Sequence, residues 1–440
     1  MQGDTEIHVQ QAPSGFELDG PTRVMIDAAP VVRSKEALVH LPVGMDWWLL
    51  ATVFGLATMG VVMAYSASVY LAVDKFGGNE VFFLTRHLRY IVVGFVALMF
   101  GLHFPYQAWR KLAYPMLGVV IALLILTLLV GETRNRATRW LLIAGISFQP
   151  SEIGKFFFIT YLACSLSKKA MTNSIRTFHL GLLPHFIVWA LVFGLCMKQP
   201  DLGTGLVLGV LLFTMTFMAG ARIAYLLFFG MGGSAVLMTF LINDPMRSKR
   251  LMAFLEPLAH RSATAYQLFN GKLAVATGGL FGQGLGASRQ KLGFIPEAHT
   301  DFVLSVIGEE LGVIGIALIA FAFVFLAYRG LRIALHARCE FGRLLAMGIV
   351  VLVSAQAAIN FGVVLGLLPT KGLTLPFVSY GGSSLMVMSL SMGVLLNIGR
   401  GGRADFSWPD VGASQFAGRD RRPSNARVMQ RHTTETRVSP

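Results

Sequence analysis

The sequence predicts an all-α, polytopic membrane protein with about ten transmembrane helices and one large extracytoplasmic loop. Apolar residues (AVILMFWYC) make up 54% of the 440 residues and charged residues 14%, against roughly a quarter charged in soluble domains. Ten separate segments are mostly apolar over about 20 residues, the length that an α-helix needs to cross a bilayer. So few charges cannot cover a folded chain of this size in water, and lipid is the solvent that the apolar surface requires.

The two ends of the chain lack such segments. Residues 1–45 carry four prolines and several acidic residues, without the basic start and apolar centre of a signal peptide, and we expect a disordered cytoplasmic arm. Residues 400–440 hold eight arginines and no apolar run, which predicts a basic cytoplasmic tail attracted to anionic lipid headgroups. The membrane domain is therefore predicted at 46–399.

Nine spans follow from the length of their apolar runs. The remaining one, Pro150–Ser167, contains an acid and a lysine, but without it the basic segments 168–179 and 329–343 would fall on opposite sides of the membrane. The ten predicted spans are Trp47–Val73, Tyr90–Trp109, Leu112–Gly131, Pro150–Ser167, Leu180–Met197, Leu202–Ala221, Ile223–Asn243, Phe302–Tyr328, Leu344–Thr370 and Gly372–Gly399.

The distribution of basic residues predicts the orientation. With both termini inside, ten Lys and Arg residues lie in short inner loops, three in the arm and eight in the tail, against eight in short outer loops. This bias favours cytoplasmic termini and places the large loop, 243–301, outside. The net charge of +14 therefore reflects a membrane protein, and we expect no nucleic-acid partner. The three scattered cysteines form neither a disulfide framework nor a metal-binding spacing.

A charged motif, Gln149–Lys155, opens the fourth predicted span. Glu152 and Lys155 are three residues apart, so they share one face of a helix. Two interpretations stay open: a mutual ion pair that locks the bundle, or a polar pocket in which Lys155 is available to an anion. A helix N-terminus at Pro150 would add free N–H groups for phosphate oxygens.

Two neighbouring features have similar alternatives. The outer loop before this span carries Arg134, Arg136 and Arg139 on the face that topology depletes of cations, which indicates either an anion site or a solvated loop. A second motif, Gln199-Pro200-Asp201, begins the sixth span. Asp201 is either part of the same site or an acid that satisfies the start of its helix.

Three groups able to move protons lie together before the eighth span: Glu297, His299 and Asp301. They end the large outer loop, so they lie at the mouth of the span, where a general base could meet a substrate. The structural alternative is equally open, because Thr300 or Asp301 can cap the helix that follows.

Two further motifs carry polar residues into the predicted membrane region. Glu309 and Glu310 either line a cavity or proton path or hydrogen-bond across the bundle. The segment from Pro369 to Ser384 places Lys371 between two prolines and continues into Gly-Gly-Ser-Ser. Broken backbone at membrane depth is tolerated where it lines a cavity, whereas small residues also permit close helix packing.

Together these motifs resemble the FtsW/RodA/SpoVE family, or SEDS proteins, of bacterial shape, elongation, division and sporulation. The resemblance runs from about Asp46 to Arg400, and Lys371-Gly372-Leu373-Thr374 is similar to the division branch. One departure is Arg136, where relatives often have glycine. The matching motifs are Arg139-Trp140, Gln149-Pro150-Ser151-Glu152, Gln199-Pro200-Asp201-Leu202-Gly203-Thr204, Gly278-Gly279-Leu280, Pro296 to Asp301, Gly308-Glu309-Glu310-Leu311-Gly312 and Pro369 to Ser384.

The resemblance implies a peptidoglycan glycosyltransferase of the bacterial inner membrane that polymerises lipid II in septal cell-wall synthesis. Its expected partners are lipid II, membrane lipid, a class B penicillin-binding protein (the division transpeptidase) and other division proteins. Asp301 matches the family's essential aspartate and is the expected general base. The reaction would invert an α-linked donor and release undecaprenyl pyrophosphate.

Seven further residues are expected to bind substrate, with three cations, Arg86, Arg139 and Lys155, as candidates to hold pyrophosphate. The full set is Arg86, Arg139, Glu152, Lys155, Asp201, Lys371 and Ser383. No cofactor follows from the sequence, although a divalent cation could assist departure of the pyrophosphate. Two alternatives from other classes stay open: a lipid II flippase, or a non-catalytic scaffold of the division machinery.

Overall fold

A computed structural model describes residues 44–401, except 76, 135–136, 144–145, 173, 244–247, 249–251, 253, 255–262 and 296. Nearly all of the predicted arm and tail, and Arg136, lie outside the described residues. Their predicted states therefore stay predictions.

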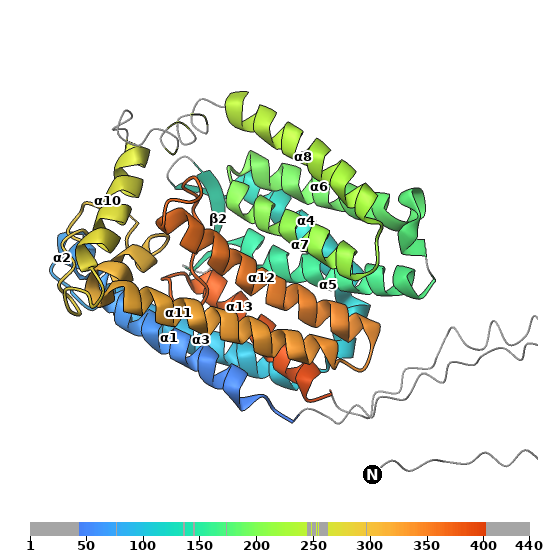
Figure 1. Ribbon diagram of the computed structural model, residues 1–440, viewed down its shortest axis with the longest axis horizontal. Coiled ribbons are helices and arrows are strands. Elements are labelled where there is room, and N and C mark those ends of the chain that lie inside the picture. Colours follow the sequence, from blue (N-terminus) through green and yellow to red (C-terminus); the bar gives the residue numbers. More distant parts are fainter. Residues whose placement is uncertain are drawn as a thin grey trace, which may run out of the picture. The chain divides into compact units, whose positions relative to one another are not determined.

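Long helices dominate the described chain (Figure 1). They are α1 (Trp47–Ser66), α2 (Val69–Lys75), α3 (Phe82–His103), α4 (Tyr106–Val130), α5 (Pro150–Met171), α6 (Leu183–Lys198), α7 (Leu202–Met218), α8 (Ile223–Asn243), α10 (Ala263–Gly278), α11 (Val303–Leu335), α12 (Glu340–Val364) and α13 (Gly382–Gly399), with a short 3₁₀ turn, Ser174–Arg176, and a π-helical turn, Phe178–Leu182, before α6.

Ten of these helices overlap the ten predicted spans, so the predicted fold class is confirmed. Two bounds were wrong at the ends of the domain: the span Trp47–Val73 is divided into α1 and α2, and the span Gly372–Gly399 is helical only from Gly382. By length and composition, seven helical segments within the described ranges can cross a membrane: α1, α3, α4, Phe178–Lys198 (with α6), α11, α12 and α13. Apolar stretches in α7 and α8 are shorter. The remaining one, α5, is 22 residues long but carries Glu152 and three lysines.

The boundary between the second and third spans differs from the prediction. The predicted span Tyr90–Trp109 crosses a turn, because α3 ends at His103 and α4 begins at Tyr106. Pro105 precedes α4 and has no N–H to continue the first helix. In addition, Asn397 Oδ1 accepts a hydrogen bond of 3.1 Å from the Tyr106 N–H, which satisfies a donor that the helix start leaves free. The predicted boundary was wrong because the apolar run continues through this turn.

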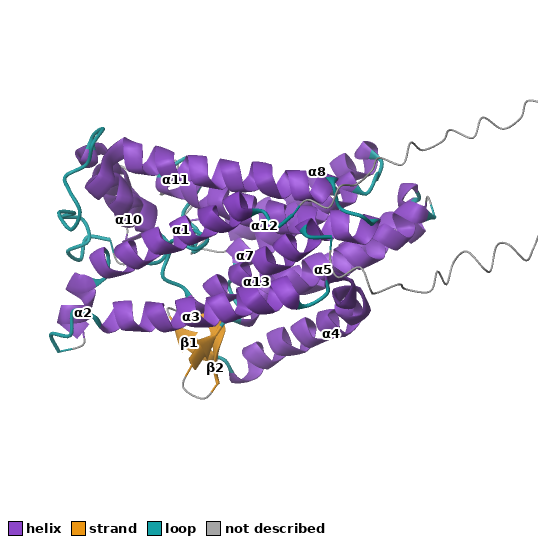
Figure 2. Ribbon diagram, turned by 90° about the horizontal axis from the view of Figure 1, so that it is seen from below, coloured by secondary structure: helices purple, strands orange, loops and turns teal. Residues whose placement is uncertain are grey.

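A small antiparallel sheet between α4 and α5 was absent from the all-α prediction. Its strands are β1 (Glu132–Arg134), β2 (Ala137–Ile143) and β3 (Ile146–Phe148), in the order β1-β2-β3. β-Branched and aromatic side chains in β2 favour a strand. The sheet extends from the helices in Figure 2 and places Arg139 on its middle strand.

The centre of the bundle is formed by α5, α12 and α13. In the most apolar 18-residue stretch of α13, 78% of the residues are buried, compared with 22% in that of α3. The outer helices expose large apolar side chains, such as Phe321 at 65% and Leu129 at 77%, and only lipid can solvate such a surface. Polar residues on the three central helices therefore face protein or an internal cavity.

Glu309 and Glu310 hydrogen-bond across the bundle, as one of the two interpretations expected. Glu309 accepts hydrogen bonds from the Ser288 hydroxyl (2.5 Å) and from two backbone N–H groups. Glu310 accepts from the Ser66 hydroxyl (2.6 Å) and forms an ion pair of 2.8 Å with Lys291. Both carboxylates thus anchor the turn between α10 and α11.

Candidate functional site

A cavity of about 550 Å³ lies at the end of the bundle that carries α2 and α10. The starts of α5 and α13, strand β2, the turn before α11 and the segment 370–381 surround it. Five predicted site residues line it: Arg139, Glu152, Asp301, Lys371 and Ser383. The other three, Arg86, Lys155 and Asp201, do not.

Asp301 lies in the turn before α11, on the wall of the cavity. A Cβ atom on Gly372 would lie 3.0 Å from Asp301 Oδ2, so the absence of a side chain at 372 lets the two segments approach. The N-cap of α11 is Phe302, which makes no side-chain capping bond. The capping role considered for Thr300 and Asp301 was therefore wrong.

The two neighbours of Asp301 have different surroundings. Glu297 lines the cavity and accepts a hydrogen bond of 3.0 Å from the Thr300 hydroxyl. His299 is buried among aromatic rings, with centroids 5.2 Å from Phe83 and 5.6 Å from Tyr380. Of these two alternative bases, only Glu297 faces the cavity.

The segment 370–381 is irregular and forms the opposite wall. The Tyr380 N–H donates to the His299 carbonyl oxygen at 3.0 Å, which joins the segment to the turn that carries Asp301. The structure thus confirms broken backbone beside a cavity, one of the two interpretations of this motif.

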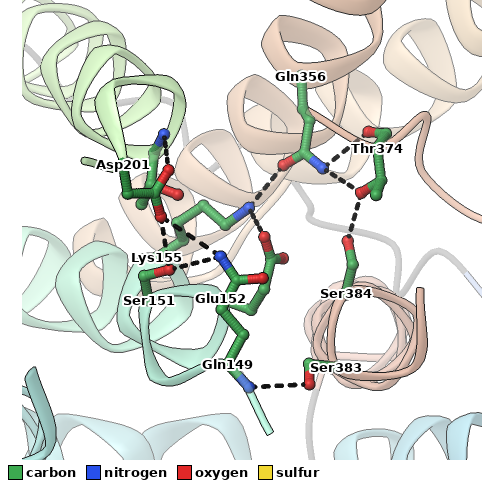
Figure 3. Close-up of polar contacts among 10 residues, drawn as sticks. Gln149, Ser151, Glu152, Lys155, Asp201, Gln356, Thr374, Ser383 and Ser384 are labelled. Atoms are coloured by element: carbon green, nitrogen blue, oxygen red, sulfur yellow. Dashed lines mark hydrogen bonds and ion pairs between the residues drawn. The ribbon is translucent and has the colours of Figure 1, made fainter. Parts of the chain in front are cut away.

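A buried polar network supports the cavity from within the bundle (Figure 3). Lys155 Nζ donates to Glu152 Oε1 and to Gln356 Oε1, each at 2.8 Å. Gln356 Nε2 donates in turn to the Thr374 carbonyl oxygen at 3.0 Å. Lys155 is fully buried, whereas Glu152 reaches the cavity wall. The network therefore links α5 and α12 to the segment 370–381, and Lys155 is used as an ion-pair partner.

Asp201 and Ser383 fix helix starts around the cavity (Figure 3). Asp201 is buried and accepts from the Thr204 N–H (3.3 Å) and the Ser151 hydroxyl (2.9 Å), so the helix-start interpretation of this acid is confirmed. Ser383 Oγ accepts from the Gln149 N–H at 3.1 Å and also lines the cavity. These bonds hold α5, α7 and α13 together at their first turns.

The two predicted arginines lie in different cavities. Arg139 lines the first cavity, and its guanidinium donates to the carbonyl oxygens of Gln199 (3.1 Å) and Pro200. Arg86 lines a second cavity along α3 of about 810 Å³, beside Arg89, and donates to the Tyr90 hydroxyl at 3.1 Å. The structure therefore does not bring Arg86 together with Asp301.

Among the described residues, metal-binding side chains do not gather at the site. Within the described ranges, no three His, Cys, Asp or Glu side chains are grouped so that they could hold a metal ion. A divalent cation would take part of its oxygen ligands from a bound diphosphate, as Mg²⁺ commonly does.

Two buried amides at the site, Gln356 and Asn360 on α12, were not predicted from the sequence. Asn360 Nδ2 donates to the carbonyl oxygens of Asp301 (2.9 Å) and Leu373 (2.7 Å). A glutamine and an asparagine four residues apart in an apolar span were a readable signal, because polar side chains in a span face its interior.

The chain is similar to known proteins over most of its length. The chain matches the family model FtsW/RodA/SpoVE, described as "Cell cycle protein", over residues 47–403. A protein of Trichlorobacter lovleyi named "Probable peptidoglycan glycosyltransferase FtsW" is 43% identical over 358 residues, 81% of this chain and 93% of that one. Stage V sporulation protein E of Bacillus subtilis is 40% identical over 357 residues, 81% of this chain and 97% of that one.

Solved structures share the fold. One, described as "Structural coordination of polymerization and crosslinking by a peptidoglycan synthase complex", has a TM-score of 0.65 and 26% identity over 82% of this chain and 99% of that one. The rod shape determining protein RodA of Thermus thermophilus has a TM-score of 0.59 and 28% identity over 80% of this chain and 96% of that one.

Proposed function

Because the chain belongs to the FtsW/RodA/SpoVE family and is a peptidoglycan glycosyltransferase of the cell-division type, we propose that the cavity around Asp301 is where it joins lipid II units. The observation that carries this proposal is one cavity that holds a carboxylate, Asp301, together with two cations, Arg139 and Lys371. A sugar–diphosphate donor needs cations at its leaving group, and a hydroxyl acceptor needs a base.

In this proposal a hydroxyl of the acceptor sugar attacks the anomeric carbon of the donor. Asp301 takes the hydroxyl proton as the new carbon–oxygen bond forms. The bond to the diphosphate breaks, and its electron pair leaves with undecaprenyl diphosphate, whose negative charge Arg139 and Lys371 offset. Attack opposite the leaving group inverts the α-linked donor to a β-linked glycan.

The other predicted residues take supporting roles in the proposal. Glu152 lines the cavity, and its second oxygen, Oε2, is buried and has no hydrogen-bond partner among the described residues. Lys155, which does not reach the cavity, holds Glu152 in place. Asp201 and Ser383 position the helix starts. Arg86 would meet the lipid-linked diphosphate only outside the first cavity.

The two competing functions are less well supported. A flippase needs a polar path across the membrane. The carboxylates of Glu309 and Glu310 are instead engaged in a hydrogen bond and an ion pair with the turn between α10 and α11. A scaffold needs no cavity with opposed charges. The test is purified protein with lipid II in detergent, where transport has no meaning. We expect glycan strands; if none form even when the partner transpeptidase is added, the polymerase proposal fails.

We further propose that the chain acts in the inner membrane at the division septum, with a class B penicillin-binding protein as its partner. A solved relative described as part of a peptidoglycan synthase complex supports a transpeptidase partner. Septal wall synthesis would also require the cavity to face outward.

The outward orientation can be tested with a natural cysteine. Cys339 is exposed in the turn between α11 and α12, which is predicted to be cytoplasmic. Leu285 is exposed between α10 and α11, in the loop that is predicted to be outside. In wall-free cells, an impermeant maleimide should label Cys339 only after permeabilisation. The matched variant Cys339→Ser/Leu285→Cys should be labelled before it. Labelling of Cys339 in intact cells would reverse the topology and place Asp301 on the wrong side.

A further inference from the structure

Asn360 connects the two walls of the cavity. This buried side chain of α12 donates from one nitrogen, Nδ2, to the carbonyl oxygens of Asp301 (2.9 Å) and Leu373 (2.7 Å). Its Oδ1 atom is buried and has no partner among the described residues. The amide is therefore held through its two donated hydrogen bonds.

These two acceptors lie on segments far apart in the sequence: one belongs to Asp301, the proposed base, and the other to Leu373 on the opposite wall. Leu373 follows Gly372, whose missing side chain leaves room for the Asp301 carboxylate. Lys371 is one residue further back and lines the same cavity. A bond from Asn360 to each main chain thus sets the spacing between the carboxylate and Lys371.

We propose that Asn360 is a positioning residue that holds Asp301 opposite Lys371, a role that rests on the proposed function. The hydrogen bond from the Tyr380 N–H to the His299 carbonyl oxygen joins the same two segments at one further point. Asn360 acts through the backbone of the base and does not line the cavity. Its loss should therefore change turnover more than substrate binding.

The experiment compares Asn360→Ala and Asn360→Leu with the wild-type chain in detergent. Leucine keeps much of the side-chain volume but lacks the Nδ2 group that donates both hydrogen bonds, so this variant separates positioning from packing. We expect kcat for glycan synthesis to fall about 10- to 100-fold, since a displacement of about 1 Å can cost up to 10²-fold, while KM for lipid II changes less than about threefold.

Asn397→Ala is the matched control. Asn397 is also a buried asparagine that bonds two backbone groups, the Tyr106 N–H (3.1 Å) and the Leu102 carbonyl oxygen (2.7 Å), but it lies on α13 away from the cavity. It should lower the melting temperature to a similar extent as Asn360→Ala and leave kcat within about twofold. Equal losses of kcat in the two variants would overturn the inference, because the effect would then be a general loss of packing.

Two further outcomes separate this inference from the proposed function. If Asn360→Leu keeps wild-type kcat while Asp301→Asn is inactive, Asn360 does not position the base, and the proposed function stands. If Asp301→Asn is itself fully active, Asp301 is not the base, and the inference fails because there is no base at 301 to position. A fall in kcat with KM retained in both Asn360 variants supports the inference.

Discussion

Asp301→Asn should lower glycan synthesis from lipid II by about 10²–10⁴-fold, the contribution typical of a general base. Asparagine keeps the size of the side chain that lies against Gly372 but cannot take the proton from the acceptor hydroxyl. Because Phe302 rather than Asp301 is the N-cap of α11, the substitution removes no cap, and the melting temperature should change little.

The measurement is the initial rate of glycan synthesis, with lipid II binding measured in parallel. Asp301→Ala should be as inactive as Asp301→Asn. Glu297→Gln serves as the control, since Glu297 is the other carboxylate of that turn on the cavity wall. Near-normal synthesis by Asp301→Asn, together with loss of synthesis in Glu297→Gln, would transfer the role of base to Glu297.

Lys155→Met should cause the largest loss of stability, about 3–5 kcal/mol, because it strands a buried carboxylate. Lys155 is fully buried, and its only two side-chain partners in the described network are Glu152 and Gln356. Glu152→Gln/Lys155→Met should recover most of this loss, since neither remaining side chain carries a charge.

The free energy of unfolding in detergent tests this expectation. Lys168→Met, an exposed lysine later in the same helix, is the control and should change the free energy by less than about 1 kcal/mol. If Lys155→Met is as stable as that control, the ion pair does not hold the central helices. If the double variant is no more stable than Lys155→Met, the cost does not come from a stranded charge.

The helices could be predicted from sequence because lipid exposure leaves a local signal. Each span needs about 20 apolar residues, so apolar runs were sufficient to locate nine of the ten helices, although the apolar stretches in α7 and α8 are shorter. The turn at Pro105 was not predicted because apolar residues continue on both sides of it. The sheet between α4 and α5 was not predicted because strands of three to seven residues are too short to show a clear alternation of apolar and polar residues.

The site could be predicted only in part, because a cavity depends on which helices pack together. The position of Asp301 at a span mouth was visible in the sequence, and so was the spacing of Glu152 and Lys155. Whether Lys155 faces a ligand depends on Gln356, a residue about two hundred positions away that packing brings to 2.8 Å. Likewise, Asn360 acquires its role only through contact with two distant segments.

Photocrosslinking of lipid II tests most directly whether the substrate occupies the cavity. A photoreactive phenylalanine analogue would replace Trp140, which lines the cavity, or Phe321, which is 65% exposed on the outer face of α11. The Asp301→Asn background keeps bound substrate from being consumed. We expect a crosslink to radiolabelled lipid II from position 140 that unlabelled lipid II competes away, and only background from position 321. Equal crosslinking from both positions, or crosslinking from 321 alone, would contradict it.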